Sequence, residues 1–158
     1  MSTQSVREYL KKYKLDDEII EFDSSSATVE LAAEAIGCEP KQIAKSITLL
    51  NGERAILIVA SGDTKIDNKK FKERFGVKAT MLKPEQVIEL VGHAIGGVCP
   101  FAVKDSVDIY FDEALKRFDY VYPAAGSSNS VIKLTLSTME EIAENFKGYV
   151  DVCKFIEG

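Results

Sequence analysis

Two apolar runs joined by an Asn-Gly pair decide the fold: Ser46-Ile-Thr-Leu-Leu50, then Asn51-Gly52, then Arg54-Ala-Ile-Leu-Ile-Val-Ala60. Asn-Gly is the favoured two-residue turn between antiparallel strands, because both residues readily adopt positive φ. Ala55–Ala60 is the longest apolar run, which suits a buried strand and is far shorter than the roughly 18–20 residues of a membrane helix. These residues predict a β-hairpin and give no indication of a membrane partner.

Helix and strand patterns alternate on both sides of this hairpin. Thr28 is a candidate N-cap for a helix that ends at Gly37, and Asp67 opens a basic helix that ends at Gly76. Other helices are expected over Ser5–Tyr13, over Pro84–Val91 and after a cap at Ser137 or Thr138, and strands over Ile19–Phe22, Lys78–Leu82, Val107–Phe111, Tyr120–Tyr122, Val131–Leu136 and Tyr149–Phe155. This order predicts a mixed α/β (α+β) fold, with a mixed β-sheet flanked by helices and not a doubly wound parallel sheet.

Length and composition predict one domain over residues 1–158. With 46% hydrophobic and 28% charged residues, the chain is typical of a folded globular domain and unlike a disordered one. Three cysteines without CxxC spacing, and no signal-peptide pattern at the N-terminus, predict reduced thiols and a cytoplasmic location. His93 is the single histidine, which excludes a multi-histidine metal site, so no metal and no cofactor are expected.

The charge of the chain is unevenly distributed. The formal net charge is −5. The range Lys41–Lys78 contains nine basic and four acidic residues, so it carries +5 and the remainder carries −10. Such asymmetry is typical either of a docking face for a polyanion or of a solvated, lysine-rich helix surface, and the pattern alone leaves both interpretations open.

Three segments are candidates for chemistry. The adjacent glycines of Gly96-Gly97-Val98-Cys99-Pro100 allow the backbone to turn its N–H groups toward a carbonyl or oxyanion, or they form a tight turn only. Lys45, at the entrance to the first apolar run, points either to a ligand or to solvent. Ala124–Ser130 is a small polar loop that either supplies hydroxyl and amide contacts or is an ordinary turn.

Cys99 also raises the hypothesis of a nucleophilic cysteine. A catalytic thiol requires a base or a positive field that lowers its pKa. His93 lies six residues earlier, but the sequence does not show that the two side chains meet. The alternative is a buried packing thiol, as we also interpret Cys38 and Cys153.

Several motifs in this order resemble the YbaK/EbsC family, the stand-alone relatives of the editing domain of bacterial prolyl-tRNA synthetase. The resemblance covers roughly residues 20–155 and is most similar to the ProX-type branch. It rests on Ile43-Ala44-Lys45-Ser46, Ser61-Gly62-Asp63, Asp67-Asn68-Lys69-Lys70, Gly92-His93-Ala94-Ile95-Gly96-Gly97-Val98-Cys99-Pro100, Pro123-Ala124-Ala125-Gly126 and Val150-Asp151-Val152-Cys153.

The resemblance implies hydrolysis of the ester in mis-aminoacylated tRNA, most often tRNA for proline carrying alanine or cysteine. It implies that Lys45 holds the phosphate or ester end of the substrate, and that the loop N–H groups of Gly96 and Gly97 bind the aminoacyl carbonyl and position water. A terminal ribose hydroxyl of the substrate would help to activate that water. The further contacts expected with substrate are those of Val98, Cys99, Pro100, Gly126 and Ser127.

The partners implied are the acceptor end of aminoacyl-tRNA and, in addition, prolyl-tRNA synthetase, with no DNA. Two features depart from the family pattern: Cys99 stands where serine is frequent, and Phe22-Asp23-Ser24-Ser25 stands where many relatives carry a histidine. Two other functions stay open, a non-catalytic RNA-binding or regulatory module of the same fold and a hydrolase that uses Cys99. A deacylation assay and a thiol-alkylating reagent distinguish them.

Overall fold

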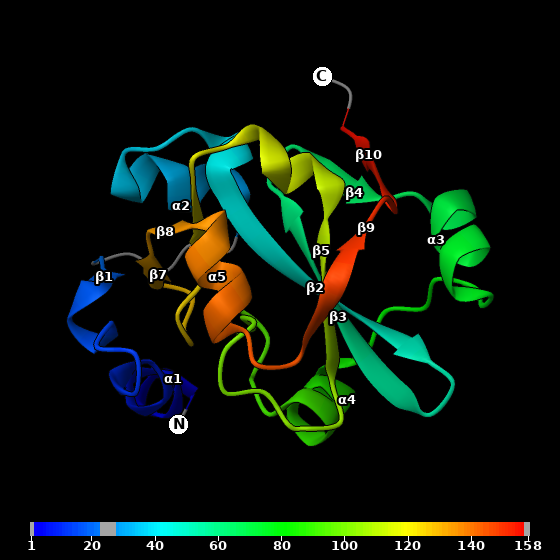
Figure 1. Ribbon diagram of the computed structural model, residues 1–158, viewed down its shortest axis with the longest axis horizontal. Coiled ribbons are helices and arrows are strands. Elements are labelled where there is room, and N and C mark those ends of the chain that lie inside the picture. Colours follow the sequence, from blue (N-terminus) through cyan, green and yellow to red (C-terminus); the bar gives the residue numbers. More distant parts are fainter. Residues whose placement is uncertain (1, 23–27, 157–158) are drawn as a thin grey trace.

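The hairpin predicted around Asn51-Gly52 lies at the centre of the protein. The computed structural model describes residues 2–22 and 28–156. Strands β2 (Ile43–Asn51) and β3 (Arg54–Ser61) pair antiparallel from Ala44↔Ser61 to Asn51↔Arg54. The two turn residues are Gly52, with φ +70°, and Glu53, one position later than the predicted Asn51-Gly52, because Asn51 still pairs within β2 and does not have positive φ. Figure 1 shows this hairpin crossing the middle of the molecule.

The described strands form one six-stranded mixed sheet and two small two-stranded sheets, which confirms the predicted fold class. The large sheet has the order β8-β6-β2-β3-β5-β9, in which β2/β6, β3/β5 and β5/β9 are parallel and β2/β3 and β6/β8 are antiparallel. The small sheets pair β1 with β7 and β4 with β10. The remaining strands are β1 (Ile19–Glu21), β4 (Thr64–Ile66), β5 (Asp108–Asp112), β6 (Tyr120–Pro123), β7 (Ser130–Ile132), β8 (Leu134–Thr135), β9 (Phe146–Val150) and β10 (Cys153–Phe155).

The helices begin and end largely at the predicted caps. Thr28 Oγ1 accepts a hydrogen bond from Leu31 N, Asp67 accepts from the backbone of α3, and Gly37 and Gly76 end their helices in the left-handed conformation. The helices are α1 (Ser2–Lys11), α2 (Val29–Ile36), α3 (Asn68–Phe75), α4 (Pro84–Gln86), which continues as a π-helical turn (Val87–Val91), and α5 (Leu136–Ile142), with 3₁₀ turns at Asp16–Glu18, Pro40–Gln42 and Glu113–Arg117.

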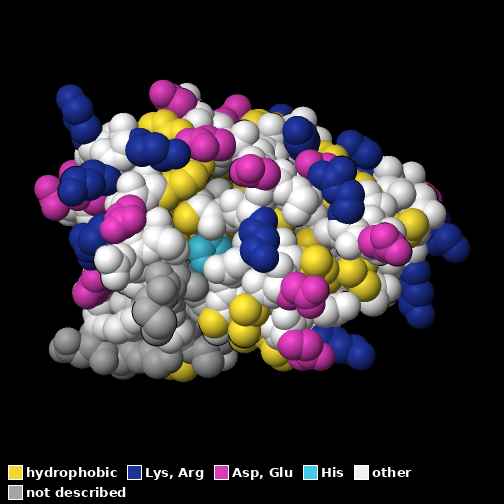
Figure 2. Space-filling model, turned by 90° about the horizontal axis from the view of Figure 1, so that it is seen from below, with side chains coloured by type: hydrophobic (Ala, Val, Ile, Leu, Met, Phe, Trp, Pro, Cys, Tyr) yellow, Lys and Arg dark blue, Asp and Glu magenta, His cyan; other side chains and the backbone are white. Residues whose placement is uncertain are grey.

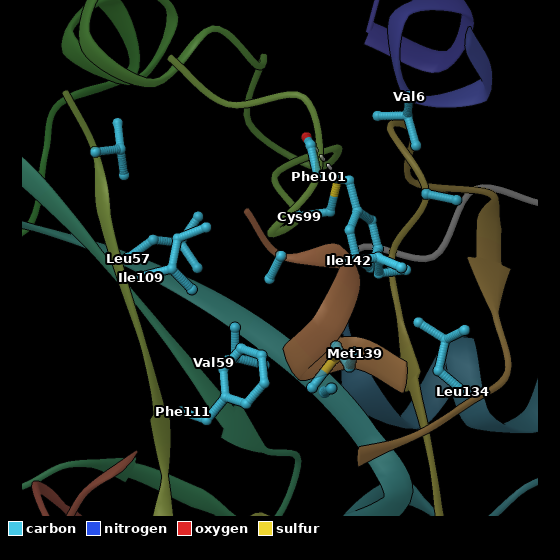
Figure 3. Close-up of a cluster of buried hydrophobic side chains, with 14 of the residues drawn as sticks. Val6, Leu57, Val59, Cys99, Phe101, Ile109, Phe111, Leu134, Met139 and Ile142 are labelled. Atoms are coloured by element: carbon cyan, nitrogen blue, oxygen red, sulfur yellow. Dashed lines mark hydrogen bonds between the residues drawn. The ribbon is translucent and has the colours of Figure 1, made fainter. Parts of the chain in front are cut away.

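Helices cover both faces of the large sheet. Alternate residues of β3 point to opposite faces, so Leu57 and Val59 belong to one buried cluster and Ile56 and Ile58 to another. The first cluster packs under α1 and α5, and Figure 3 shows part of it, including Met139 and Ile142 of α5. The second cluster packs under α3 through Phe71.

Three predicted strands differ from the structure. Lys78–Leu82 runs beside β2 but forms only an isolated bridge between Met81 and Leu49. The strand expected over Val131–Leu136 divides at the exposed Lys133 into β7 and β8, which join different sheets. The strand expected over Tyr149–Phe155 divides into β9 and β10. The backbone N–H of Val152 leaves the ladder there and donates to Asp112 Oδ1 at 3.1 Å.

The predicted cap of the last helix is also wrong. Thr135, not Ser137 or Thr138, is the N-cap of α5, and its Oγ1 accepts a hydrogen bond from Thr138 N at 3.1 Å. Strand β8 ends at this residue, so one threonine ends a strand and begins a helix. Thr135, Ser137 and Thr138 are all suitable N-cap residues by type. Thr135 is the cap because β8 ends there.

Candidate active site

A pocket of about 360 Å³ lies beside the edge of β2. Its walls come from Phe22, from α2, from the first half of β2, from the segment between Met81 and Val87, from the glycine-rich loop, and from β6 and β7 with the turn between them. The lining residues are Phe22, Thr28, Val29, Ala32, Ile43, Ala44, Lys45, Ser46, Ile47, Thr48, Met81, Leu82, Val87, Ile95, Gly96, Val98, Tyr122, Ala124, Ser127, Ser128, Ser130 and Val131. The pocket therefore brings together Lys45, Gly96, Val98 and Ser127 of the predicted site.

Lys45 presents an ammonium group without a protein partner to this pocket. The residue is half-buried in β2, and its side-chain ammonium makes no hydrogen bond or ion pair with any residue of the ranges 2–22 and 28–156. Burial lowers the pKa of Lys45, while its neighbours Cys153, Asp63 and Glu30 act in the opposite direction. A partly desolvated cation of this kind favours an anion or a developing negative charge on a ligand.

Arg117 holds Asp63 in place near Lys45. The sequence did not indicate this role of Arg117. The Arg117 guanidinium donates to both Asp63 oxygens, at 2.8 and 3.1 Å, and to Ser61 Oγ at 3.0 Å. Burial opposes ionisation of Asp63, but the hydrogen bonds from Arg117 and Ser61 outweigh it and hold the pKa of this carboxyl below its usual value. The carboxylate therefore stays charged and keeps a negative field close to Lys45.

The edge of β2 is open where it faces the pocket. Strand β6 pairs with β2 only at Ile43 and Ala44, and the next neighbour along this edge is Leu82, whose N–H donates to Thr48 O at 3.2 Å. Ser46 lies between these two points, so the alternation of the ladder directs its main-chain N–H and C=O toward the pocket. Its hydroxyl is buried and has no hydrogen-bond partner in the described part of the chain. Sequence reasoning also missed this residue.

The glycine-rich loop reaches the pocket at Gly96 and Val98 and is supported from behind at Gly97. Gly96 has φ +96°, a conformation that favours glycine, and Gly97 N donates to Ala94 O at 3.0 Å. A Cβ on Gly97 would lie 2.4 Å from Gly126 O. The loop and the β6–β7 turn are thus in backbone contact, with Gly97 and Gly126 as the touching residues.

The predicted site residues Cys99 and Pro100 lie outside the pocket lining. The Cys99 side chain is fully buried and points into the core near Phe101 and Ile142 (Figure 3). Its Sγ lies 3.7 Å from His93 Nε2 and 3.6 Å from Phe101 O. Burial raises the pKa of the Cys99 thiol to about 12. The thiol is therefore both inaccessible and protonated, and it is unsuited to nucleophilic attack.

The β6–β7 turn contributes Ser127 to the pocket wall. Its hydroxyl contacts Asn129 Oδ1 at 2.8 Å and Ser130 Oγ at 2.7 Å. Asn129 in turn donates from Nδ2 to Phe22 O at 3.1 Å, which fastens the turn to the residue that follows β1. Phe22 lines the pocket, and the rest of the predicted segment, 23–25, lies outside the described residues.

Part of the positive charge of Lys41–Lys78 is paired within the chain. Lys41 contacts Glu39 at 3.5 Å, Arg54 contacts Asp108 at 3.6 Å and Lys70 contacts Asp151 at 3.1 Å. On the face shown in Figure 2, basic and acidic side chains are interspersed. No described helix is long and apolar enough to cross a membrane.

Comparisons with known proteins show the family of this chain. A family model described as "Aminoacyl-tRNA editing domain" matches residues 23–142, so the chain belongs to the aminoacyl-tRNA editing domain family. The "Uncharacterized protein YwhH" of Bacillus subtilis (strain 168) is 49% identical over 155 residues, which cover 98% of both chains. The resemblance to the prolyl-tRNA synthetase editing domain and its stand-alone relatives is thereby confirmed.

Two further similar proteins carry proline–tRNA ligase or prolyl tRNA synthetase in their own descriptions. The proline–tRNA ligase of Lactiplantibacillus plantarum is 26% identical over 131 residues, which are 82% of this chain and 22% of the ligase. A crystal structure described as "a putative trans-editing enzyme for prolyl tRNA synthetase" superposes with a TM-score of 0.86 at 28% identity and covers 97% of each chain.

Proposed function

We propose that this protein hydrolyses the ester bond of mis-aminoacylated tRNA, with alanyl- or cysteinyl-tRNA for proline as substrate. The observation that carries the proposal is the half-buried, unpartnered Lys45 ammonium in the same pocket as Gly96. Membership of the editing family and the likeness to a trans-editing structure support the reaction class. The partner is the aminoacylated acceptor end of tRNA, with prolyl-tRNA synthetase as a further partner, and residues 1–158 act as one editing domain in the cytoplasm.

Each part of the pocket has a role in this reaction. Lys45 pairs with the phosphate or ester end of the terminal nucleotide, and the loop N–H of Gly96 receives the carbonyl oxygen as it gains negative charge. The N–H of Gly97, which the sequence also suggested for this role, is bonded to Ala94 O and supports the loop instead. The open edge at Ser46 offers one main-chain donor and one acceptor to the aminoacyl group. Val98 and Ser127 form the walls, while Cys99, Pro100 and Gly126 support the loop from behind.

Water is the nucleophile in this mechanism. Cys99 is buried and protonated, and among the residues 2–22 and 28–156 no histidine, aspartate or glutamate lines the pocket to act as a base. The ribose hydroxyl next to the ester then activates the water, and the leaving ribose oxygen takes up a proton. The protein contributes orientation and charge stabilisation.

The test is a deacylation panel with alanyl-, cysteinyl- and prolyl-tRNA for proline. Lys45→Ala should lower kcat/KM roughly 30- to 1,000-fold. This corresponds to a loss of about 2–4 kcal/mol of transition-state binding, since one charge-assisted contact is removed. Lys65→Ala is the matched control, because Lys65 is an exposed lysine of the same basic segment outside the pocket. Wild-type rates in Lys45→Ala refute the assignment of Lys45. Absence of deacylation by the wild-type protein, with tRNA binding retained, favours the non-catalytic module.

A further inference from the structure

His93 is a buried titratable residue that the proposed reaction does not use. It follows Gly92, which ends the helical segment after α4 with its N–H bonded to Val87 O. The side chain is 1% exposed, and Nε2 lies 2.7 Å from Phe101 O. This contact connects His93, three positions before Gly96, with the residue that directly follows Pro100 at the end of the glycine-rich loop.

The contact defines the protonation state of the ring. A carbonyl oxygen only accepts hydrogen bonds, so Nε2 carries the proton and donates it to Phe101 O. Nδ1 is buried and has no hydrogen-bond partner among the described residues. Protonation at Nδ1 would place a second donor where no acceptor faces it, and burial accordingly lowers the pKa of His93. Neutral imidazole with Nε2–H is therefore the resting form. Because Nε2 is already protonated, it cannot serve as a base for Cys99.

Both ends of the contact are anchored in rigid structure. Phe101 is fully buried, with its ring 6.4 Å from that of Tyr9 in α1, and Figure 3 shows it among the core side chains. The π-helical turn before Gly92 buries Val87 and Val91. Between the two anchors, Gly96 and Val98 line the pocket. The His93–Phe101 hydrogen bond thus connects the segment that leads into the loop with the buried Phe101 that follows the loop.

We propose that His93 is the positioning residue of the glycine-rich loop, and that its Nε2–H···O bond to Phe101 holds Gly96 and Val98 at the distance from Lys45 that the reaction needs. This inference rests on the proposed deacylase function. It assigns His93 no contact with substrate, because the ring is enclosed behind the loop. Its effect is on the position of the carbonyl-binding N–H of Gly96.

Replacement of His93 by glutamine, leucine and asparagine tests the proposal. The glutamine amide reaches about as far as Nε2 and restores the donor, leucine fills similar space without one, and the shorter asparagine has a donor that stops near the position of Nδ1. We expect His93→Gln to stay within about threefold of the wild-type kcat. His93→Leu and His93→Asn should lose at least tenfold in kcat with KM changed less than threefold, since a displacement on the order of 1 Å costs about 10²-fold.

Lys104→Ala is the matched control. Lys104 Nζ also ties a side chain to a nearby carbonyl, that of Glu89, but the bond is exposed and outside the pocket, so kcat should not change. Thermal unfolding of each variant identifies those that fold, and the Asn variant carries the comparison if the Leu variant does not. Equal kcat in the Gln, Asn and Leu variants overturns the positioning role. Inactivity of the wild type overturns the proposed function instead, and an active wild type that Lys45→Ala leaves unchanged overturns only the assignment of Lys45.

Discussion

Gly97→Ala is the most direct test of the contact between the two loops. The added Cβ would lie 2.4 Å from Gly126 O and 2.7 Å from Gly126 C, whereas ordinary contact begins at 3.4 Å. The neighbour is backbone, which cannot rotate away, so the loops must separate by about 1 Å. Gly97 does not have positive φ, so alanine adds no torsional strain and the effect is steric. A displacement of about 1 Å at a reacting centre costs on the order of 10²-fold.

The assay is single-turnover deacylation of alanyl-tRNA for proline, with thermal unfolding measured in parallel. Gly76→Ala is the control for lost stability: Gly76 has φ +76° at the end of α3, and a Cβ there meets no atom within 4 Å. It should cost about 1–2 kcal/mol of stability and leave the rate unchanged. Gly97→Ala should lose about 10²-fold in rate, and Gly97→Val more. A Gly97→Ala rate within threefold of wild type refutes the argument that this contact sets the loop position.

Three further predictions concern charge and the cysteines. Affinity for tRNA should fall as the salt concentration rises. Replacement of the α3 lysines Lys69, Lys70 and Lys72 by glutamate should weaken the binding of any tRNA about equally. An affinity that does not respond to salt would mean that this helix is only a solvated surface. Cys99→Ser should keep most of the activity, because the thiol is buried behind the loop, whereas a loss of several orders of magnitude at normal thermal stability restores the nucleophilic cysteine. Under native conditions, iodoacetamide should modify the partly exposed Cys38 before Cys99, as mass spectrometry of peptides would show; early labelling of Cys99 contradicts its burial.

Local sequence signals predicted the elements whose ends are marked by local chemistry. Asn51-Gly52 predicted the hairpin because Gly52 readily takes the positive φ that the turn requires, although the turn is centred on Gly52 and Glu53 because Asn51 still pairs with Arg54. Thr28 and Asp67 predicted helix starts because each caps a backbone N–H only two or three residues away. Val131–Leu136 was predicted as one strand because its alternation hides the exchange of partners at Lys133, and strand partners are chosen by tertiary contacts.

The candidate site divides in the same way. Lys45 and Gly96 were predicted from their residue types and from a family resemblance, and both line the pocket. Arg117 was missed because its partner Asp63 lies 54 residues earlier, and nothing local distinguishes it from a solvated arginine. The open edge at Ser46 was missed because it depends on where β6 stops pairing with β2. The pairing of His93 with Phe101 is equally invisible in the sequence, although the two residues lie only eight positions apart.

The parallel pairing of β2 with β6 makes the pocket a late product of folding. Strands β2 and β3 are neighbours in the chain and can pair early. Ile43 pairs with Tyr122 only after the intervening sequence, which includes α3 and the glycine-rich loop, has been synthesised. On the ribosome, the hairpin emerges long before the last pocket wall at Val131. Under the proposed function, a nascent chain therefore has no working pocket through most of its synthesis. Its hydrolytic activity appears only after Val131 has left the ribosome.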